Sequence, residues 1–383
     1  MIYLDNSATS FYKPQQVKNA VVNAINNLTA NPGRSAHKPS QQVDALVYET
    51  RERLKNFFNA PNHNVVFTKN CTEAINLAIL GIVKTGDHII TTCYEHNSVL
   101  RTLNKMEQND VEVTILNASI ENFAHEVETK IKSNTKMIIT TYISNVTGEE
   151  CDVKKVGKIC KRHNIIYLVD AAQACGHTRV DLMQSNIDML AFSGHKGLLA
   201  LTGVGGLMVK KGLTLQPLLC GGTGTESESL VQPTDYPEGY ESGTLPTMSI
   251  VSLNEGVEFL QRNFNEILKK EELLTKYLIK KLKVSNFIKI YSTEKSKNVV
   301  SFNVDGLDST LVANLLDEKF NICVRPGLHC APQVHKRLGT LKTGAVRASL
   351  DFNNTFEEID KLIVALTKIF EFQFGNDFAG NTH

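Results

Sequence analysis

Short apolar runs alternate with segments of helical spacing along the first half of the chain. The runs lie near residues 65–68, 89–92, 111–116, 137–142, 165–169 and 188–192. Continuous apolar runs of this length are typical of central strands in a parallel sheet. Since the segments between them keep apolar positions three and four residues apart, the pattern predicts a doubly wound, mainly parallel α/β sheet with right-handed crossovers.

The last third of the chain has a different pattern. Residues 221–244 are rich in Gly, Ser, Thr, Glu and Pro, which predicts a long irregular loop of the kind that is usually functional or mobile. A helical stretch over about 247–283 follows, and short strands then alternate with helices. We therefore expect a large domain over residues 15–246 and a smaller α+β domain formed by residues 1–14 and 247–383.

Composition excludes several classes of protein. The 383 residues carry 41 Lys and Arg against 40 Asp and Glu, which argues against a nucleic-acid-binding surface. No run approaches the roughly 20 apolar residues that span a bilayer, and the first residues do not resemble a signal peptide. The eight cysteines are scattered without a Cys-x-x-Cys pair, so we expect no metal site, and thiols in a reducing cytoplasm.

One lysine and one aspartate carry the strongest chemical signal. Lys196 lies in a Ser-Gly-His-Lys-Gly turn just past the run at 188–192, where a buried amine can act as a nucleophile toward a carbonyl. Ser193 and His195 in the same turn could hold a phosphate. Asp170 ends the preceding strand, where a buried carboxylate needs a partner such as a pyridinium N–H. A lysine paired with such an aspartate is typical of pyridoxal phosphate enzymes. The alternatives are a solvated lysine and a helix-capping aspartate.

Four more polar residues follow predicted strands, at the sheet edge where parallel sheets bind ligands. Thr72 would add a hydroxyl to the anion site at a helix N-terminus, or act as an ordinary cap. His96 would stack on a flat cofactor ring, or lie in a surface loop. Asn145 and Gln173 would hydrogen-bond the cofactor's phenolic oxygen or the substrate, or act as turn amides.

Two residues near the C-terminus complete the candidate chemistry. Cys330 lies in a Pro- and Gly-containing turn, where Arg325 and His329 are expected to lower its pKa and favour a reactive thiolate. Arg347 lies on an otherwise apolar segment, and its planar fork suits a substrate α-carboxylate. The alternatives are an inert cysteine and a structural ion pair.

Five motifs together resemble the cysteine desulfurase and selenocysteine lyase family of class V aminotransferases. The motifs are Ser193-Gly194-His195-Lys196, Asp170-Ala171-Ala172-Gln173, Glu95-His96-Asn97-Ser98, Ser144-Asn145-Val146-Thr147-Gly148 and Arg325-x-Gly327-x-His329-Cys330-Ala331. The resemblance covers essentially the whole chain and implies the type I PLP-dependent transferase fold. It also implies a homodimer that removes sulfur from L-cysteine, or selenium from L-selenocysteine, and leaves alanine, with a persulfide on Cys330 and an acceptor protein for the cargo.

The resemblance also implies a role for each site residue. Catalytic roles fall to Lys196, Cys330 and His96. Cofactor contacts fall to Lys196, Asp170, Gln173, His96, Cys71, Thr72, Ser193 and His195, and to Thr244, which would reach the phosphate held by the other protomer. Substrate contacts fall to Arg347, Asn145 and His37. Cys71 departs from the family pattern, since a smaller residue is expected before the phosphate-binding threonine.

Two other activities stay open at this point. A different PLP-dependent C–S lyase would release pyruvate and ammonia instead of alanine. A non-catalytic, sulfur-carrying scaffold on the same fold would tolerate loss of Lys196. Neither composition nor spacing distinguishes sulfur from selenium as the cargo.

Overall fold

The structure is a computed structural model that describes residues 1–33, 37–120 and 122–374. The chain divides into two compact units. The large unit comprises residues 12–142 and 151–264, and the small unit comprises residues 1–11, 143–150 and the chain from 265 onward. The division differs from the expected domains at three places. The first segment of the small unit ends at residue 11 instead of 14, residues 143–150 belong to the small unit, and the last boundary falls inside one long helix instead of before it.

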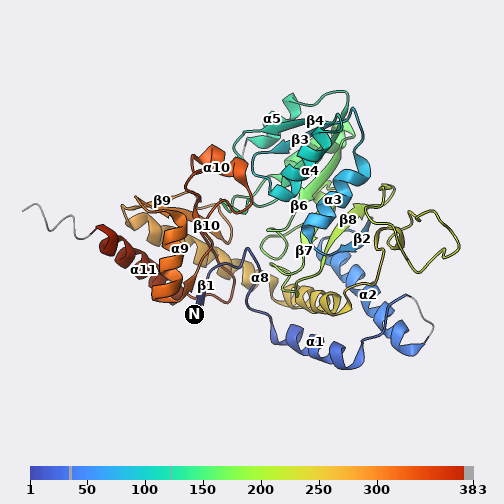
Figure 1. Ribbon diagram of the computed structural model, residues 1–383, viewed down its shortest axis with the longest axis horizontal. Helices are drawn as coiled ribbons and strands as arrows, with labels where there is room; N and C mark the ends of the chain where they lie inside the picture. Colours follow the sequence, from blue (N-terminus) through green and yellow to red (C-terminus); the bar gives the residue numbers. More distant parts are fainter. Residues whose placement is uncertain (34–36, 121, 375–383) are drawn as a thin grey trace, which may run out of the picture. The chain divides into compact units, whose positions relative to one another are not determined.

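A seven-stranded sheet forms the centre of the large unit (Figure 1). Its strands are β2 (His63–Thr68), β3 (His88–Thr92), β4 (Glu112–Leu116), β5 (Thr135–Thr141), β6 (Ile166–Asp170), β7 (Met189–Ser193) and β8 (Gly205–Lys210). The order across the sheet is β2-β8-β7-β6-β5-β3-β4, and only β8 runs antiparallel to its neighbours. The prediction of a mainly parallel sheet with intervening helices is therefore confirmed.

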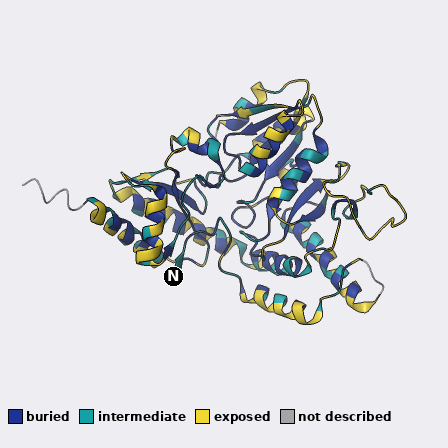
Figure 2. Cartoon of the chain, in the orientation of Figure 1, coloured by how far each residue is buried: buried dark blue, intermediate teal, exposed yellow. Residues whose placement is uncertain are grey.

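The helices of the large unit connect successive strands. They are α1 (Gln15–Asn27), α2 (Lys38–Phe57), α3 (Cys71–Ile82), α4 (Asn97–Glu107), α5 (Phe123–Thr129), α6 (Val153–His163), α7 (Leu182–Ser185), the 3₁₀ turn Glu238–Tyr240 and the first part of α8 (Thr247–Val284). Figure 2 shows most strands of this sheet coloured as buried and much of α1 as exposed, and only the edge strand β4 is largely uncovered. Strands covered on both faces explain the continuous apolar runs in the sequence.

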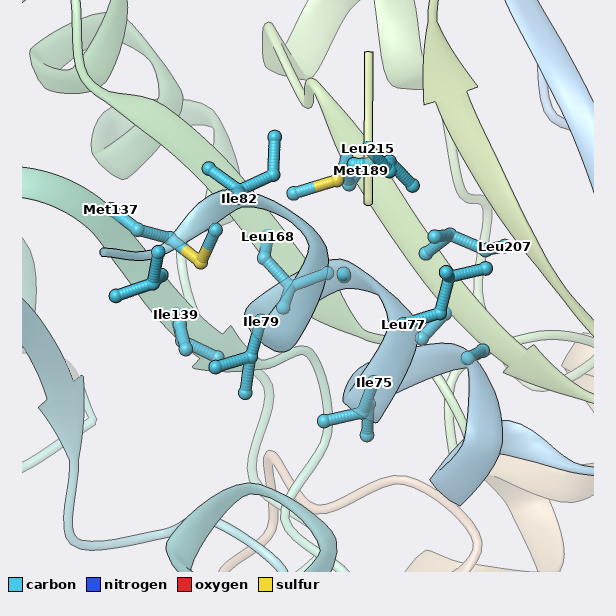
Figure 3. Close-up of a cluster of buried hydrophobic side chains, with 14 of the residues drawn as sticks. Ile75, Leu77, Ile79, Ile82, Met137, Ile139, Leu168, Met189, Leu207 and Leu215 are labelled. Atoms are coloured by element: carbon cyan, nitrogen blue, oxygen red, sulfur yellow. The ribbon is translucent and has the colours of Figure 1, made fainter. Parts of the chain in front are cut away.

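Helix α3 shows how the core is built. Its apolar positions, including Ile75 and Ile79, recur three and four residues apart and are buried. They pack on side chains from the sheet, among them Ile139 of β5 and Leu168 of β6 (Figure 3). This packing fixes the position of the helix, and its N-terminus opens at the carboxyl ends of the parallel strands.

The small unit combines short strands with helices, as the α+β pattern predicts. Its elements are β1 (Ile2–Tyr3), β9 (Ile288–Ile290), β10 (Val299–Val304), α9 (Ser309–Phe320), β11 (Ile322–Cys323), α10 (Pro332–Leu338), β12 (Val346–Ser349), α11 (Phe356–Phe374) and the second part of α8. Strands β12, β10 and β9 form an antiparallel sheet, whereas β1 pairs with β11 in parallel. None of the described helices is long and apolar enough to cross a bilayer.

Candidate active site

The carboxyl ends of three adjacent strands bring candidate residues together in the large unit. Asp170 ends β6, where it pairs in register with Thr141 of β5 and Ala191 of β7. Ser193 is the last residue of β7, two residues after Ala191. Asp170 is only 4% exposed, so its carboxylate lies inside the protein at the strand ends.

Two glycines hold the lysine-bearing turn against the segment that follows β6. A Cβ atom on Gly176 would lie 2.2 Å from the carbonyl oxygen of Gly197, and Gly176 has a φ of +94°. A Cβ atom on Gly197 would lie 2.2 Å from the carbonyl oxygen of Cys175. Because no side chain fits between these backbones, the turn that carries half-buried Lys196 lies against the segment that begins at Asp170.

A thiol contacts the aspartate directly. Cys71 Sγ donates a hydrogen bond to Asp170 Oδ1 at 3.4 Å, and the backbone N–H of Ala172 donates to the same oxygen at 3.0 Å. Burial and the negative charge of Asp170 raise the pKa of Cys71 well above its ordinary value, while nearby Lys196 acts in the opposite direction. Cys71 therefore stays protonated and acts as a donor, a role that sequence analysis did not assign to its side chain.

The N-terminus of α3 provides an anion-binding end. Asn70 is the cap, since its side chain accepts the backbone N–H of Glu73 at 3.0 Å. Thr72 is therefore not the capping residue, and its exposed hydroxyl has no hydrogen-bond partner among the described residues. A Cβ atom on Gly205 would lie 2.9 Å from Asn70 Cα, so a glycine is needed for β8 to approach this end of the helix. The arrangement fits an anion held by backbone N–H groups and a hydroxyl.

A glutamate that sequence analysis overlooked lies between two of these strands. Glu95 is fully buried, and its Oε1 accepts hydrogen bonds from Thr92 Oγ1 at 2.6 Å and from the Thr141 backbone N–H at 2.8 Å. Its Oε2 has no partner among the described residues. Burial raises the pKa of Glu95 to about 8, with a further contribution from the charge of Asp170. Glu95 is therefore mostly protonated at pH 7. From the sequence alone, a Glu beside a candidate histidine would be expected to be an exposed, charged side chain.

The two candidate histidines differ in their surroundings. His96 caps α4, where its Nδ1 accepts the Ser98 backbone N–H at 3.0 Å. His195 lies beside Lys196, and Lys13 Nζ donates to the His195 carbonyl oxygen at 3.3 Å. Burial and these two ammonium groups lower the pKa of His195 to about 4. His195 is therefore neutral at pH 7, and Lys13, which no sequence motif suggested, adds a positive charge near the lysine turn.

The small unit brings together a second group of candidate residues around Arg347. Its guanidinium is 1% exposed and donates to Asp5 Oδ1 at 2.9 Å and to the Asn145 carbonyl oxygen at 3.1 Å. Nε of Arg347 is buried and has no hydrogen-bond partner among the described residues. Burial lowers the pKa of Arg347, and the charge of Asp5 opposes that shift. The structural ion pair with Asp5 is thus present, and one donor of the fork remains unsatisfied.

Cys330 lies next to this group, but one of its expected neighbours behaves differently from the prediction. Asn145 Nδ2 donates to the His329 carbonyl oxygen at 2.6 Å, and both His329 and Cys330 have positive φ angles, of 49° and 58°. Burial and the charge of Arg347 lower the pKa of His329 to about 2. His329 is therefore neutral and contributes no positive charge that would favour a Cys330 thiolate. Cys330 lies close enough to Arg347 to contribute to the pKa of that guanidinium.

The three remaining candidates are Gln173, Thr244 and His37. Gln173 is buried three residues beyond Asp170. Thr244 is exposed, and the loop that carries it is tied down at Glu241, whose carboxylate accepts from both terminal nitrogens of Arg51 at 2.8 and 2.6 Å. His37 is exposed and caps α2 through a 3.3 Å hydrogen bond from the Ser40 backbone N–H. The structure shows no contact between His37 and the other candidate residues in the described ranges.

Comparisons with known proteins identify the family of the chain. The family model for the class-V aminotransferases matches residues 2–362. A probable cysteine desulfurase from Pyrococcus abyssi is 35% identical, over 96% of this chain and 94% of the relative. One from Methanothermobacter thermautotrophicus is 33% identical over the same shares. The solved structure of an apo cysteine desulfurase from Thermococcus onnurineus NA1 has a TM-score of 0.90 and 34% identity, covering 96% of this chain and 94% of the other. The chain therefore belongs to the class-V aminotransferase family.

Proposed function

We propose that the protein is a pyridoxal phosphate-dependent enzyme that removes sulfur from L-cysteine, leaving alanine and a persulfide on Cys330. The named relatives and the solved neighbour are cysteine desulfurases. The observation that carries the proposal is the arrangement of Lys196 and Asp170, which the paired glycines and the Cys71 thiol bring into one buried region of the large unit.

The donor set of the large unit fits pyridoxal phosphate. Asp170 uses Oδ1 for two hydrogen bonds, and Oδ2 accepts none from the described residues, so it is available to a ring N–H. The first turn of α3 and the exposed Thr72 hydroxyl suit a phosphate. Ser193 is the last residue of β7, which lies next to β6, the strand that ends in Asp170.

The residues of the large unit then have separate tasks. When bound, pyridoxal phosphate supplies a ring that accepts the electron pair released at the substrate Cα. Lys196 would hold the cofactor, and its free amine would take the Cα proton. Asp170 would pair with the ring nitrogen, and His96 would contact the ring.

The residues of the small unit bind the substrate and receive the sulfur. The buried, unsatisfied Nε of Arg347 is a donor that a substrate α-carboxylate would satisfy. Asn145 is oriented by its bond to the His329 carbonyl oxygen and keeps Arg347 in place through its own carbonyl oxygen. Cys330 Sγ would attack the substrate sulfur, and the Cβ–S bond would break with its electron pair left on Cβ, which takes up a proton to become the methyl group of alanine. The sulfur would stay on Cys330 until an acceptor protein takes it.

We further propose a homodimer. Thr244 is exposed in the single chain, and the Arg51–Glu241 ion pair fixes the loop that presents it. An exposed hydroxyl on an anchored loop suits the contact with the cofactor phosphate of a second copy that the family resemblance implies.

The decisive experiment combines the absorbance spectrum of the purified protein with product analysis. We expect a yellow protein that loses its visible band when Lys196 is replaced by Ala. L-cysteine should yield alanine and sulfide in the presence of a reductant, and Cys330→Ala should abolish sulfide release while the visible band remains. Pyruvate and ammonia in place of alanine would identify the other C–S lyase. Turnover of L-selenocysteine alone would identify the selenium-specific enzyme, and a colourless protein that binds no cofactor would refute the proposal.

A further inference from the structure

Asp170 is surrounded by acidic groups that keep their protons. Burial raises the pKa of Cys71 and of Cys175 well above the ordinary value of a thiol, and the negative charge of Asp170 adds to both shifts. The same charge contributes to the raised pKa of Glu95. Of these three neighbours, only Cys71 donates a hydrogen bond to the Asp170 carboxylate.

The backbone around Cys71 holds the thiol in place. Cys71 is the first residue of α3, directly after the capping residue Asn70, and its side chain is 7% exposed. The first residue of β8 is Gly205, and a Cβ atom on it would lie 2.9 Å from Asn70 Cα, so only a glycine lets β8 approach the Asn70 backbone this closely. The start of α3 is therefore packed closely against the start of β8, next to the thiol that contacts Asp170.

The two hydrogen bonds to Asp170 fall on the same oxygen. The Ala172 backbone N–H and the Cys71 thiol both donate to Oδ1, which leaves Oδ2 as the acceptor with remaining capacity. A carboxylate held at one oxygen by donors from two separate elements has a fixed plane. Loss of one donor would allow the carboxylate to rotate about its Cβ–Cγ bond.

We propose that the Cys71 side chain is a positioning residue for the cofactor ring: its thiol fixes the carboxylate of Asp170 so that Oδ2 faces the ring nitrogen. The inference rests on the proposed function, because it assumes that Asp170 binds the ring nitrogen of pyridoxal phosphate. It adds a side-chain role at the position where the chain departs from the small residue expected in the family.

The test compares matched replacements of two buried thiols. Cys71→Ala removes the donor, Cys71→Ser keeps a donor at the same position, and Cys175→Ala removes an equally buried thiol that makes no hydrogen bond to Asp170. Each variant is stripped of cofactor and titrated with pyridoxal phosphate. The ring nitrogen is then observed by NMR in protein loaded with ¹⁵N-labelled pyridoxal phosphate, with Asp170→Asn as the reference for a lost carboxylate.

We expect Cys71→Ala to bind pyridoxal phosphate about fivefold more weakly, the effect of one lost hydrogen bond, and to shift the ring ¹⁵N resonance toward that of Asp170→Asn. Cys71→Ser and Cys175→Ala should both match the wild type within about twofold. Wild-type affinity and resonance in Cys71→Ala would overturn the inference. If Cys71→Ala does not fold, the Cys71→Ser variant decides the matter. A ring ¹⁵N resonance shifted as far as in Asp170→Asn would overturn the inference, and an unshifted resonance would support it. A wild-type protein that takes up no pyridoxal phosphate would instead refute the proposed function.

Discussion

Protonation of Glu95 gives the stability of the protein a specific pH dependence. The folded protein holds a proton on Glu95 up to about pH 8, whereas the unfolded chain releases it near the ordinary value of 4.5. The folded state therefore binds more protons between these two values, so the contribution of Glu95 to the free energy of unfolding falls as pH rises from 4.5 to 8 and is constant above that range. Because the Gln side chain cannot ionise, the Glu95→Gln variant should not show this decrease in the free energy of unfolding.

The size of the effect follows from the two pKa values. Each pH unit inside the window changes the free energy of unfolding by at most about 1.4 kcal/mol. Between pH 5 and pH 7.5 the wild type should therefore lose about 3 kcal/mol relative to Glu95→Gln. Gln keeps the oxygen that accepts hydrogen bonds from Thr92 and Thr141, so the variant preserves the local structure.

Urea unfolding of both proteins, in the same cofactor state, at pH 5, 6, 7 and 7.5 measures the difference. Burial also lowers the pKa of several histidines, such as His63 and His329, but their contributions are common to both proteins and cancel in the difference. Exposed Glu107 on α4 provides the control Glu107→Gln, which should show no such pH-dependent difference. A difference between Glu95→Gln and wild type that stays constant over this range would refute the assignment of a buried, protonated Glu95.

Three other variants test the geometry of the site. Arg347→Lys should raise the KM for L-cysteine about tenfold or more with a smaller effect on kcat, because an ammonium cannot replace the planar fork; an unchanged KM in steady-state assays would contradict its role. Gly176→Ala should lower the melting temperature and bleach the visible band, since its Cβ would lie 2.2 Å from the carbonyl oxygen of Gly197. In the control Gly212→Ala, the residue has a similar φ of +92° but open space around its Cβ, so this variant measures the backbone strain alone. Equal effects of Gly176→Ala and Gly212→Ala would disprove a specific clash at Gly176. Glu241→Gln should cost more than about 1 kcal/mol in the free energy of unfolding, measured by denaturant titration, because it leaves half-buried Arg51 without its charged partner; a smaller loss, typical of an exposed ion pair, would contradict that anchor.

The regular elements were predictable because local pattern and burial agree in them. The apolar run at 137–142 corresponds to β5 (Thr135–Thr141), and the segment of helical spacing between it and the run at 165–169 contains α6 (Val153–His163). Strand ends such as Asp170 were predictable for the same reason, since a parallel sheet collects them at one edge. The division between the two units was less predictable, because α8 continues through it with an uninterrupted helical pattern.

The finer contacts depend on packing between segments that are far apart in the chain. Cys71 and Asp170 are 99 positions apart, and Lys13 meets His195 across 182 positions. No spacing rule connects such pairs. The charge of His329 was mispredicted for a related reason: its neighbours in sequence suggest a cation, but burial in the folded unit decides its protonation.

The first and last parts of the chain complete the small unit together. β1 pairs with β11, and Asp5 binds Arg347, which lies 342 positions later. During synthesis on the ribosome, about 320 further residues must be added after β1 before β11 is complete. At the usual 5 to 20 residues per second this delay is roughly 16 to 64 s. Strand β1 therefore stays without its partner strand throughout that interval, because β11 has not yet been made.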